Sequence, residues 1–164
     1  MNTTTTERQP VPIITSAELL EHWQGHRGLT RRLIEAFPEK DLFEYSIGGM
    51  RSFAMMVQEL LAIAVPGLRQ IVEGKTEELN EHIEASNTKA NILSLWDRST
   101  ADIQNYWGQI PDERFHDTIL SFGQYEGTVQ SAVLYFIDNE IHHRAQGYVY
   151  LRSLGIEPPA FWKR

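Results

Sequence analysis

The sequence predicts an all-α fold, a four-helix bundle with long crossover connections. Four stretches repeat apolar residues every three or four positions, which is the spacing that gives a helix one apolar face. Glycine or proline stands at most of the boundaries between these stretches, where such residues commonly end helices. Two connections, residues 38–47 and 108–125, are long enough to cross the bundle.

The first helix is predicted to begin near Thr15, because Thr15-Ser16-Ala17-Glu18 has the pattern of a capping box. Helical spacing then continues to Phe37, and Pro38 ends the helix. Residues 38–45 predict a connector. Residues 1–14 contain a threonine run and two prolines and predict a flexible tail.

The second helix is predicted to follow Gly48-Gly49 with a strongly apolar face. Pro66-Gly67 is expected to break or kink this helix, and a short helix is expected to continue to Gly74. Residues 75–87 are polar and charged, and they predict a loop or an exposed helical turn.

The third helix is predicted over residues 88–107 and the last, longest helix over residues 126–154. Between them, residues 112–124 predict either a short strand or an irregular crossover. The aromatic pair at residues 161–162 is apolar enough to dock back on the bundle. Residues 15–164 are therefore interpreted as a single domain, because a chain of 164 residues has about the length of one ordinary domain.

Composition excludes several classes of function. The chain contains no cysteine, which excludes disulfides, thiolate nucleophiles and cysteine-ligated metal sites. Its net charge of -7 argues against nucleic acid as a partner, because binding to phosphates needs clustered lysine and arginine. No window approaches about 18 uncharged apolar residues, so no membrane-spanning helix is predicted. The N-terminus lacks the pattern of a signal peptide, and a cytoplasmic location is expected.

The last helix carries the densest group of polar residues. Asn139 and His143 are four positions apart and therefore share one face, which the apolar pattern places toward the core. A histidine on such a face is either a hydrogen-bonded core residue or a metal ligand. Asp138 and His142 form a second pair, rotated by about 100° and predicted to lie on the surface.

Five further residues interrupt apolar stretches or flank them. Glu59 lies among apolar residues of the second helix, and it is expected to be exposed, paired with an arginine or bound to a metal. Arg51 and Arg144 are expected to close salt bridges at the ends of helices. His22 is predicted to be exposed, and His26 is predicted to lie at the flank of the first helix, within reach of a cleft.

Several of these motifs together resemble those of a known family. The motifs lie in three segments: Trp23…His26-Arg27…Thr30…Phe37-Pro38 in the first helix, Met50-Arg51-Ser52-Phe53-Ala54 before the second, and Glu140-Ile141-His142-His143-Arg144-Ala145-Gln146…Tyr150-Leu151-Arg152 in the last. Over residues 15–162 the chain resembles the DinB-like family of helical-bundle proteins, which includes metal-dependent thiol S-transferases. The resemblance implies the same fold and a homodimer.

The resemblance also implies a divalent metal ion, namely Ni, Zn, Mn or Mg, held by three histidines. One histidine comes from the second helix and two come from an H-x-x-x-H pair in the last helix. These positions fall on Glu59, Asn139 and His143, so one histidine remains. A carboxylate, an amide oxygen and one imidazole form a harder donor set, which favours Mn or Mg over Zn or Ni. The competing interpretation is a hydrogen-bonded cluster of the same three residues without metal.

Two classes of function follow from these interpretations. In the first, the protein is a metal-dependent hydrolase or thiol S-transferase that acts on a small electrophile, with His26 and Arg144 supporting the metal ligands or contacting the substrate. In the second, the protein has lost the family's catalytic site and is a metal-free homodimer that binds a small molecule or serves a structural role.

Overall fold

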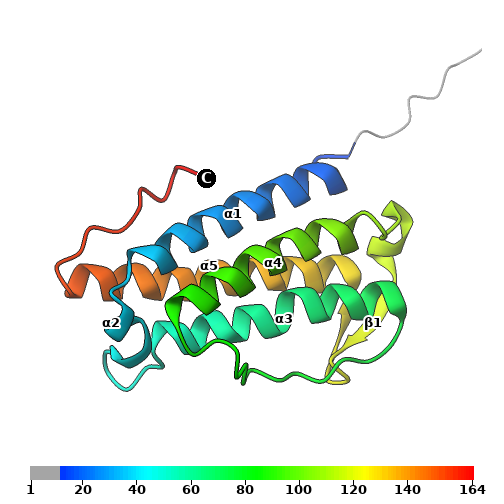
Figure 1. Ribbon diagram of the computed structural model, residues 1–164. Helices are drawn as coiled ribbons and strands as arrows, with labels where there is room; N and C mark the ends of the chain where they lie inside the picture. Colours follow the sequence, from blue (N-terminus) through cyan, green and yellow to red (C-terminus); the bar gives the residue numbers. More distant parts are fainter. Residues whose placement is uncertain (1–11) are drawn as a thin grey trace, which may run out of the picture.

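Four long helices and a small β-hairpin make up residues 12–164, the part of the chain that the computed structural model describes (Figure 1). The helices and strands, in chain order, are α1 Ser16–Ala36, α2 Glu39–Glu44, α3 Phe53–Glu73, α4 Lys89–Trp107, the 3₁₀ turn η1 Asp112–His116, β1 Thr118–Ser121, β2 Tyr125–Thr128 and α5 Val129–Ser153. The predicted all-α bundle is confirmed. Residues 1–11 of the predicted N-terminal tail lie outside the described residues, and residues 12–15 precede the first helix.

The helices are arranged as the long connections predict. α3 packs against α4 and α5, and α1 packs against the same two helices. α1 and α3 therefore occupy one diagonal of the bundle, and α4 and α5 occupy the other. The chain crosses a diagonal between α1 and α3, by way of α2, and again between α4 and α5, by way of η1 and the hairpin (Figure 1).

Side-chain caps fix where the long helices begin. The capping box of α1 is present: the Thr15 hydroxyl accepts from the Glu18 amide at 3.2 Å, and the Glu18 carboxylate accepts from the Thr15 amide at 2.8 Å. Ser52 caps α3, which therefore begins at Phe53 and not directly after the two glycines. Thr128 caps α5, so the predicted start at residue 126 is wrong by three residues.

Two predicted connections contain regular structure. The expected connector at residues 38–45 holds the short helix α2, which seats Leu42 in the core. Residues 118–128 form a two-stranded antiparallel sheet, in which Ser121 pairs with Tyr125 across a turn at Gly123. Of the two alternatives for residues 112–124, the short strand is therefore present, and its partner strand replaces the first turn predicted for the last helix.

Of the two effects predicted for Pro66, a break or a kink, the break is absent from α3. The helix is continuous from Phe53 to Glu73, although Pro66 has no amide hydrogen to donate to the preceding turn. Ile63 and Leu68, on either side of the proline, are buried in the core. Packing of this strongly apolar helix on both neighbours therefore outweighs the local cost of the proline.

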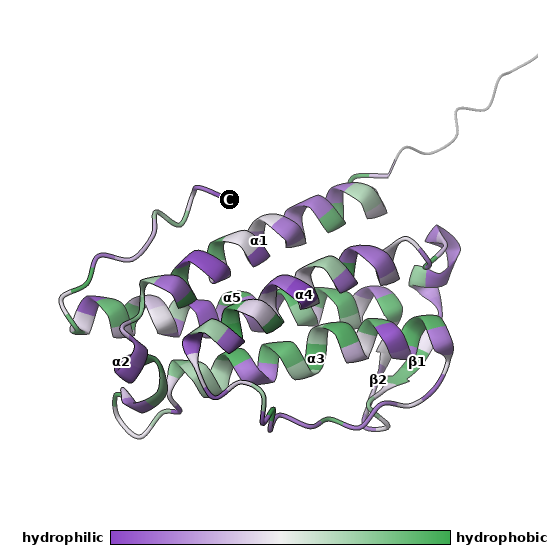
Figure 2. Ribbon diagram, viewed as in Figure 1, coloured by the Kyte–Doolittle hydropathy of each residue, from purple (hydrophilic) through white to green (hydrophobic). Residues whose placement is uncertain are grey.

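α3 also qualifies, by length and composition, as a helix able to cross a membrane, which the sequence pattern did not suggest. Its residues are mostly hydrophobic (Figure 2), and 56% of the qualifying window is buried inside the bundle. Because the core helix of a soluble protein passes the same test, this is weak evidence for a membrane span.

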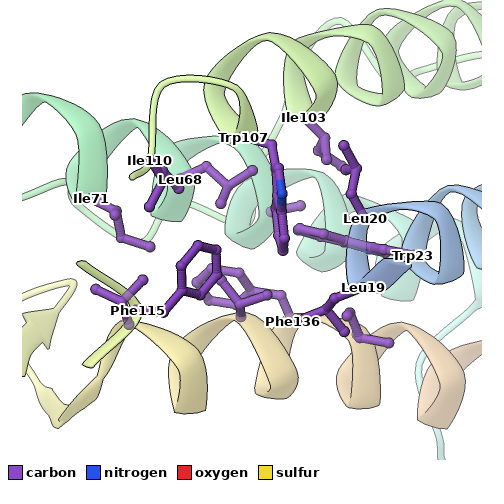
Figure 3. Close-up of a cluster of buried hydrophobic side chains, with 14 of the residues drawn as sticks. Leu19, Leu20, Trp23, Leu68, Ile71, Ile103, Trp107, Ile110, Phe115 and Phe136 are labelled. Atoms are coloured by element: carbon purple, nitrogen blue, oxygen red, sulfur yellow. The ribbon is translucent and has the colours of Figure 1, made fainter. Parts of the chain in front are cut away.

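The core consists of two apolar clusters with polar residues between them. One cluster, toward the hairpin, joins Trp23 of α1, Trp107 of α4 and Phe136 of α5 (Figure 3). The other cluster, toward α2, contains Phe53 and Tyr150. Between the clusters the four long helices contribute a polar layer, which we define as His26, Arg27, Thr30, Glu59, Ser99, Asn139, Glu140, His143 and Arg144, all buried. This layer contains every residue to which the sequence assigned a site.

The C-terminal aromatic pair does not dock on the bundle as predicted. Phe161 and Trp162 are 63% and 71% exposed, and their rings pack against each other. The chain end returns along α1 (Figure 1), but polar groups hold it: the Arg32 guanidinium donates to the Lys163 carbonyl, and Arg164 lies over Gly25.

Two glycines in helices give a matched test of this packing. At Gly147 of α5 a Cβ atom would lie 2.6 Å from the Phe53 ring and 2.9 Å from Leu33, whereas at Gly28 of α1 the nearest atom, of Arg32, is 3.7 Å away. We expect Gly147→Ala to lower the free energy of unfolding by about 1 kcal/mol, since overpacking outweighs the gain in helix propensity. Gly28→Ala should raise the same quantity by about 0.5–1 kcal/mol. Urea unfolding of both variants measures this, and equal effects would contradict the close packing at Gly147.

Candidate functional site

α5 carries two polar clusters on two of its faces. Asn139 and His143 point toward α3, and their sequence neighbours Glu140 and Arg144 point toward α1. Consecutive residues of a helix are about 100° apart, so the two pairs meet different neighbours. The predicted site residues are therefore divided between two places in the polar layer.

The cluster between α3 and α5 brings together the three predicted metal ligands. Oε1 of Glu59 accepts a hydrogen bond from the Asn139 side-chain amide at 3.0 Å and lies 3.2 Å from Nε2 of His143. Oε2 of Glu59 accepts from the guanidinium of Arg51. The other ring nitrogen of His143, Nδ1, lies 2.9 Å from Oε1 of Gln146. Both nitrogens of His143 thus face an oxygen atom, and neither is left free for a substrate.

Arg51 is the residue of this site whose partners the sequence did not identify. Its guanidinium contacts Glu59 on α3 and, at 3.2 Å, Glu81 in the long connection between α3 and α4. Its carbonyl accepts from the hydroxyl of Tyr150 at 2.8 Å. Of the three environments considered for Glu59, the structure has the one in which an arginine pairs with it.

The charge of Glu59 is compensated within this cluster. Burial raises the pKa of the carboxyl, but the hydrogen bonds from Arg51, Asn139 and His143 together outweigh burial and hold the pKa below its ordinary value. Glu59 is therefore an anion at neutral pH, and Arg51 provides the opposing positive charge.

The second cluster lies between α1 and α5 and centres on Glu140. Its Oε1 accepts from the Thr30 hydroxyl at 2.6 Å, and its Oε2 accepts from the Trp23 indole at 3.2 Å. Guanidinium nitrogens of Arg27 and Arg144 lie 3.7 and 3.9 Å from the carboxylate. All five side chains are buried, so this cluster faces the interior of the bundle and not a cavity.

His26 and Arg144 belong to the Glu140 cluster, which differs from the supporting role predicted for them at the metal site. Nη2 of Arg144 lies 2.8 Å from Nδ1 of His26, whose Nε2 lies 3.1 Å from Nε2 of His22. Burial lowers the pKa of His26 to about 3, with further lowering by the charges of Arg144, Arg164 and His22. His26 is therefore neutral, and its Nδ1 accepts the hydrogen bond from Arg144.

A cavity of about 380 Å³ opens beside the Glu59 cluster. α3 and α5, the β-hairpin and the connection between α3 and α4 form its walls. The lining is apolar in part, with Ile63 and Leu79, and it includes Glu59 at one side. Sequence analysis missed the contribution of the hairpin, because the short run of residues 118–128 does not reveal which helices it will cover. The volume falls within the range of about 300–1,000 Å³ found for small-molecule sites.

The Glu59 cluster as arranged does not fit a metal ion. One oxygen of Glu59 is taken by the guanidinium of Arg51, whose positive charge would oppose a second cation beside the same carboxylate. Asn139 directs its amide nitrogen, and not its oxygen, toward Oε1 of Glu59. Within residues 12–164 no group of three or more His, Asp or Glu side chains is placed to hold a metal ion.

Comparison with known proteins identifies the family. The sequence model of the DinB family matches residues 1–163. A crystal structure of a DinB-like protein from Bacillus cereus ATCC 10987 superposes with a TM-score of 0.70 at 16% identity, covering 88% of this chain and 95% of that chain. A DinB-like protein of Bacillus subtilis, YjoA, superposes with a TM-score of 0.69 at 20% identity, covering 90% and 99%.

No curated protein matches the sequence. At these identities the two structures establish the shared fold, and the family model adds the relationship in sequence over nearly the whole chain. The chain therefore belongs to the DinB family.

Proposed function

We propose that this chain is a DinB-family protein that binds a small organic molecule, without a metal ion, in the cavity beside Glu59. The observation that carries this proposal is the ion pair between Arg51 and Glu59 at the side of the 380 Å³ cavity. The guanidinium of Arg51 already neutralises the carboxylate of Glu59, which a metal ion would need as a ligand. The cavity remains as a place for a ligand whether or not chemistry takes place there.

The walls of the cavity suit a ligand with an apolar body. Ile63, Leu79, Phe122 and Phe136 contribute apolar surface, while serine and glutamate side chains supply hydrogen-bonding groups. Small-molecule sites typically combine a mainly apolar lining with a few polar groups that orient the ligand. Burial of an apolar body here would stabilise the complex by about 25 cal/mol per Å² of apolar surface removed from water.

The metal-dependent alternative, a hydrolase or thiol S-transferase, requires a rearranged cluster. Arg51 would have to leave Glu59, and the Asn139 amide would have to turn its oxygen toward the ion, so that Glu59, Asn139 and His143 all present donors. The proximity of these side chains supports this alternative, since Asn139 and His143 each lie within hydrogen-bonding distance of Glu59. Binding of Ni, Zn, Mn or Mg, a homodimeric assembly and a cytoplasmic location stay predictions.

Metal titration and ligand titration together test the proposal. Calorimetric titration of Mn, Ni, Zn and Mg into chelator-treated protein is expected to give no stoichiometric binding in the wild type. Arg51→Met removes the opposing guanidinium while keeping an unbranched side chain, and it is the variant in which metal binding should first become detectable. Stoichiometric binding to the wild type that is lost in His143→Ala would overturn the metal-free proposal.

The cavity itself is tested with a neutral aromatic alcohol, phenylbutanol, added to metal-free protein and followed by NMR chemical shifts. We expect saturable shifts of residues around the cavity. Ser131→Trp, at an exposed position of the lining, should abolish these shifts by filling the cavity mouth without disturbing the core. Absence of saturable binding to the wild type would contradict a small-molecule site.

A further inference from the structure

Apart from two tyrosines, the ionisable side chains that line the cavity are carboxylic acids. Glu59, Glu81 and Glu126 contribute carboxylates from α3, from the long connection and from β2. None of the described residues in the lining is a lysine, an arginine or a histidine. Arg51 neutralises part of this charge from outside the lining, through Glu59 and Glu81, but Glu126 forms no ion pair within residues 12–164. The cavity therefore has an excess of negative charge.

A neighbouring tyrosine responds to the same charge. Partial burial raises the pKa of the Tyr135 hydroxyl, and the negative charges of Glu59 and Glu81 raise it further. Tyr135 lines the cavity from α5, so the two carboxylates, although Arg51 offsets part of their charge, act on this wall of the cavity. The same field that disfavours a phenolate there favours a positively charged group.

Aromatic rings complete the surroundings of a cation. Tyr125 and Tyr135 line the cavity and are 59% and 57% exposed, which places them at its mouth, whereas Phe122 and Phe136 are buried deeper. The face of an aromatic ring attracts an ammonium group within about 6 Å. The tyrosine rings of the lining and its excess of carboxylates are therefore two separate attractions for a positively charged group.

We propose that the cavity selects organic cations, that is, small molecules in which an apolar or aromatic body is joined to a protonated amine. The inference rests on the proposed function, since it names the class of ligand for the same site. The apolar body lies against Ile63 and Phe136, and the amine lies at the mouth, on the side of the tyrosines. A carboxylate or phosphate ligand of the same size meets the opposite field and is disfavoured.

Three probes of matched shape test the sign of the charge: phenylbutylamine, phenylbutanol and phenylbutyrate, each titrated into metal-free protein near neutral pH. The amine is expected to bind about tenfold more tightly than the alcohol, because a partly exposed ion pair and a cation–π contact each add to its affinity. Phenylbutyrate is expected to bind more weakly than the alcohol. Raising the salt concentration should reduce the amine's advantage and leave the alcohol unchanged.

Glu126→Gln is the matched variant, because it removes one charge and keeps the size of an exposed side chain. It should lower the affinity for the amine several-fold and leave that for the alcohol unchanged. Equal affinities of the three probes in the wild type, all abolished by Ser131→Trp, would overturn the cation preference while the proposed site stands. Amine binding that survives Ser131→Trp would also overturn it. Failure of the alcohol to bind would instead contradict the proposed function itself.

Discussion

Replacing Glu140 by alanine is expected to lower the free energy of unfolding by about 3–5 kcal/mol. Glu140 is the anion of the cluster between α1 and α5, and its carboxylate lies 3.7 Å from Arg27 and 3.9 Å from Arg144. Both guanidinium groups are buried, so they would lose their counter-charge without gaining water. The Trp23 indole and the Thr30 hydroxyl would lose an acceptor as well. Urea unfolding monitored by tryptophan fluorescence measures the change.

An exposed ion pair provides the control for this prediction. Glu35 pairs with Arg31 at 3.4 Å on the surface of α1, where both side chains are well exposed. Glu35→Ala should change the free energy of unfolding by less than about 0.5 kcal/mol. Similar losses for Glu35→Ala and Glu140→Ala would show that water reaches the Glu140 cluster, and would contradict its burial.

Acidification is expected to destabilise the fold through His26. In the folded protein its pKa is lowered to about 3, whereas in the unfolded chain it titrates near its ordinary value of about 6.5. Above pH ~6.5 both states are neutral and His26 contributes nothing to the pH dependence. Below that pH the unfolded chain binds a proton that the folded protein does not, so stability falls. At about pH 5 the loss reaches about 2 kcal/mol, and it continues toward pH ~3.

His26→Asn separates this effect from other titrations. The asparagine oxygen takes the approximate place of Nδ1 and keeps an acceptor for Arg144, but it cannot be protonated in this range. The slope of unfolding free energy against pH, between about pH 6.5 and pH 5, should flatten in this variant. His82→Asn, in the exposed connection between α3 and α4, is the matched control for replacing a histidine by asparagine. An unchanged slope in His26→Asn would contradict a neutral, buried His26.

Much of the fold follows from local patterns in the sequence. The capping box at Thr15 and Glu18 and the apolar spacing of the four long helices act over one or two turns, so a sequence reveals them. The continuity of α3 through Pro66 could not be predicted in this way, because it depends on packing against helices distant in the sequence. The exposure of Phe161 and Trp162 likewise depends on polar contacts that hold the chain end over α1.

The candidate site also combines features that the sequence predicts with contacts that depend on the packing of whole helices. The helical spacing of Asn139 and His143 predicts a shared face, and the resemblance adds Glu59 from another helix; the three do lie together. Spacing does not show that Arg51 reaches Glu59, since this contact depends on where Ser52 starts α3. Nor does it show that His26 and Arg144 meet on the opposite side of α5 from the cavity, because a residue's partner is decided by the packing of whole helices.

The two polar faces of α5 have a consequence for how the bundle chooses one arrangement. Apolar contacts are non-directional, so beyond steric fit they specify the rotation of a helix less sharply than hydrogen bonds do. A roll of about 100° that turned Asn139 toward α1 would carry Glu140 past α1, leaving Arg27 without an anion and Glu59 without its amide donor. The polar layer thus sets the rotational phase of α5, the helix whose apolar stripe is most interrupted. Apolar packing brings the helices together, and a few charged side chains determine how far α5 is turned about its axis.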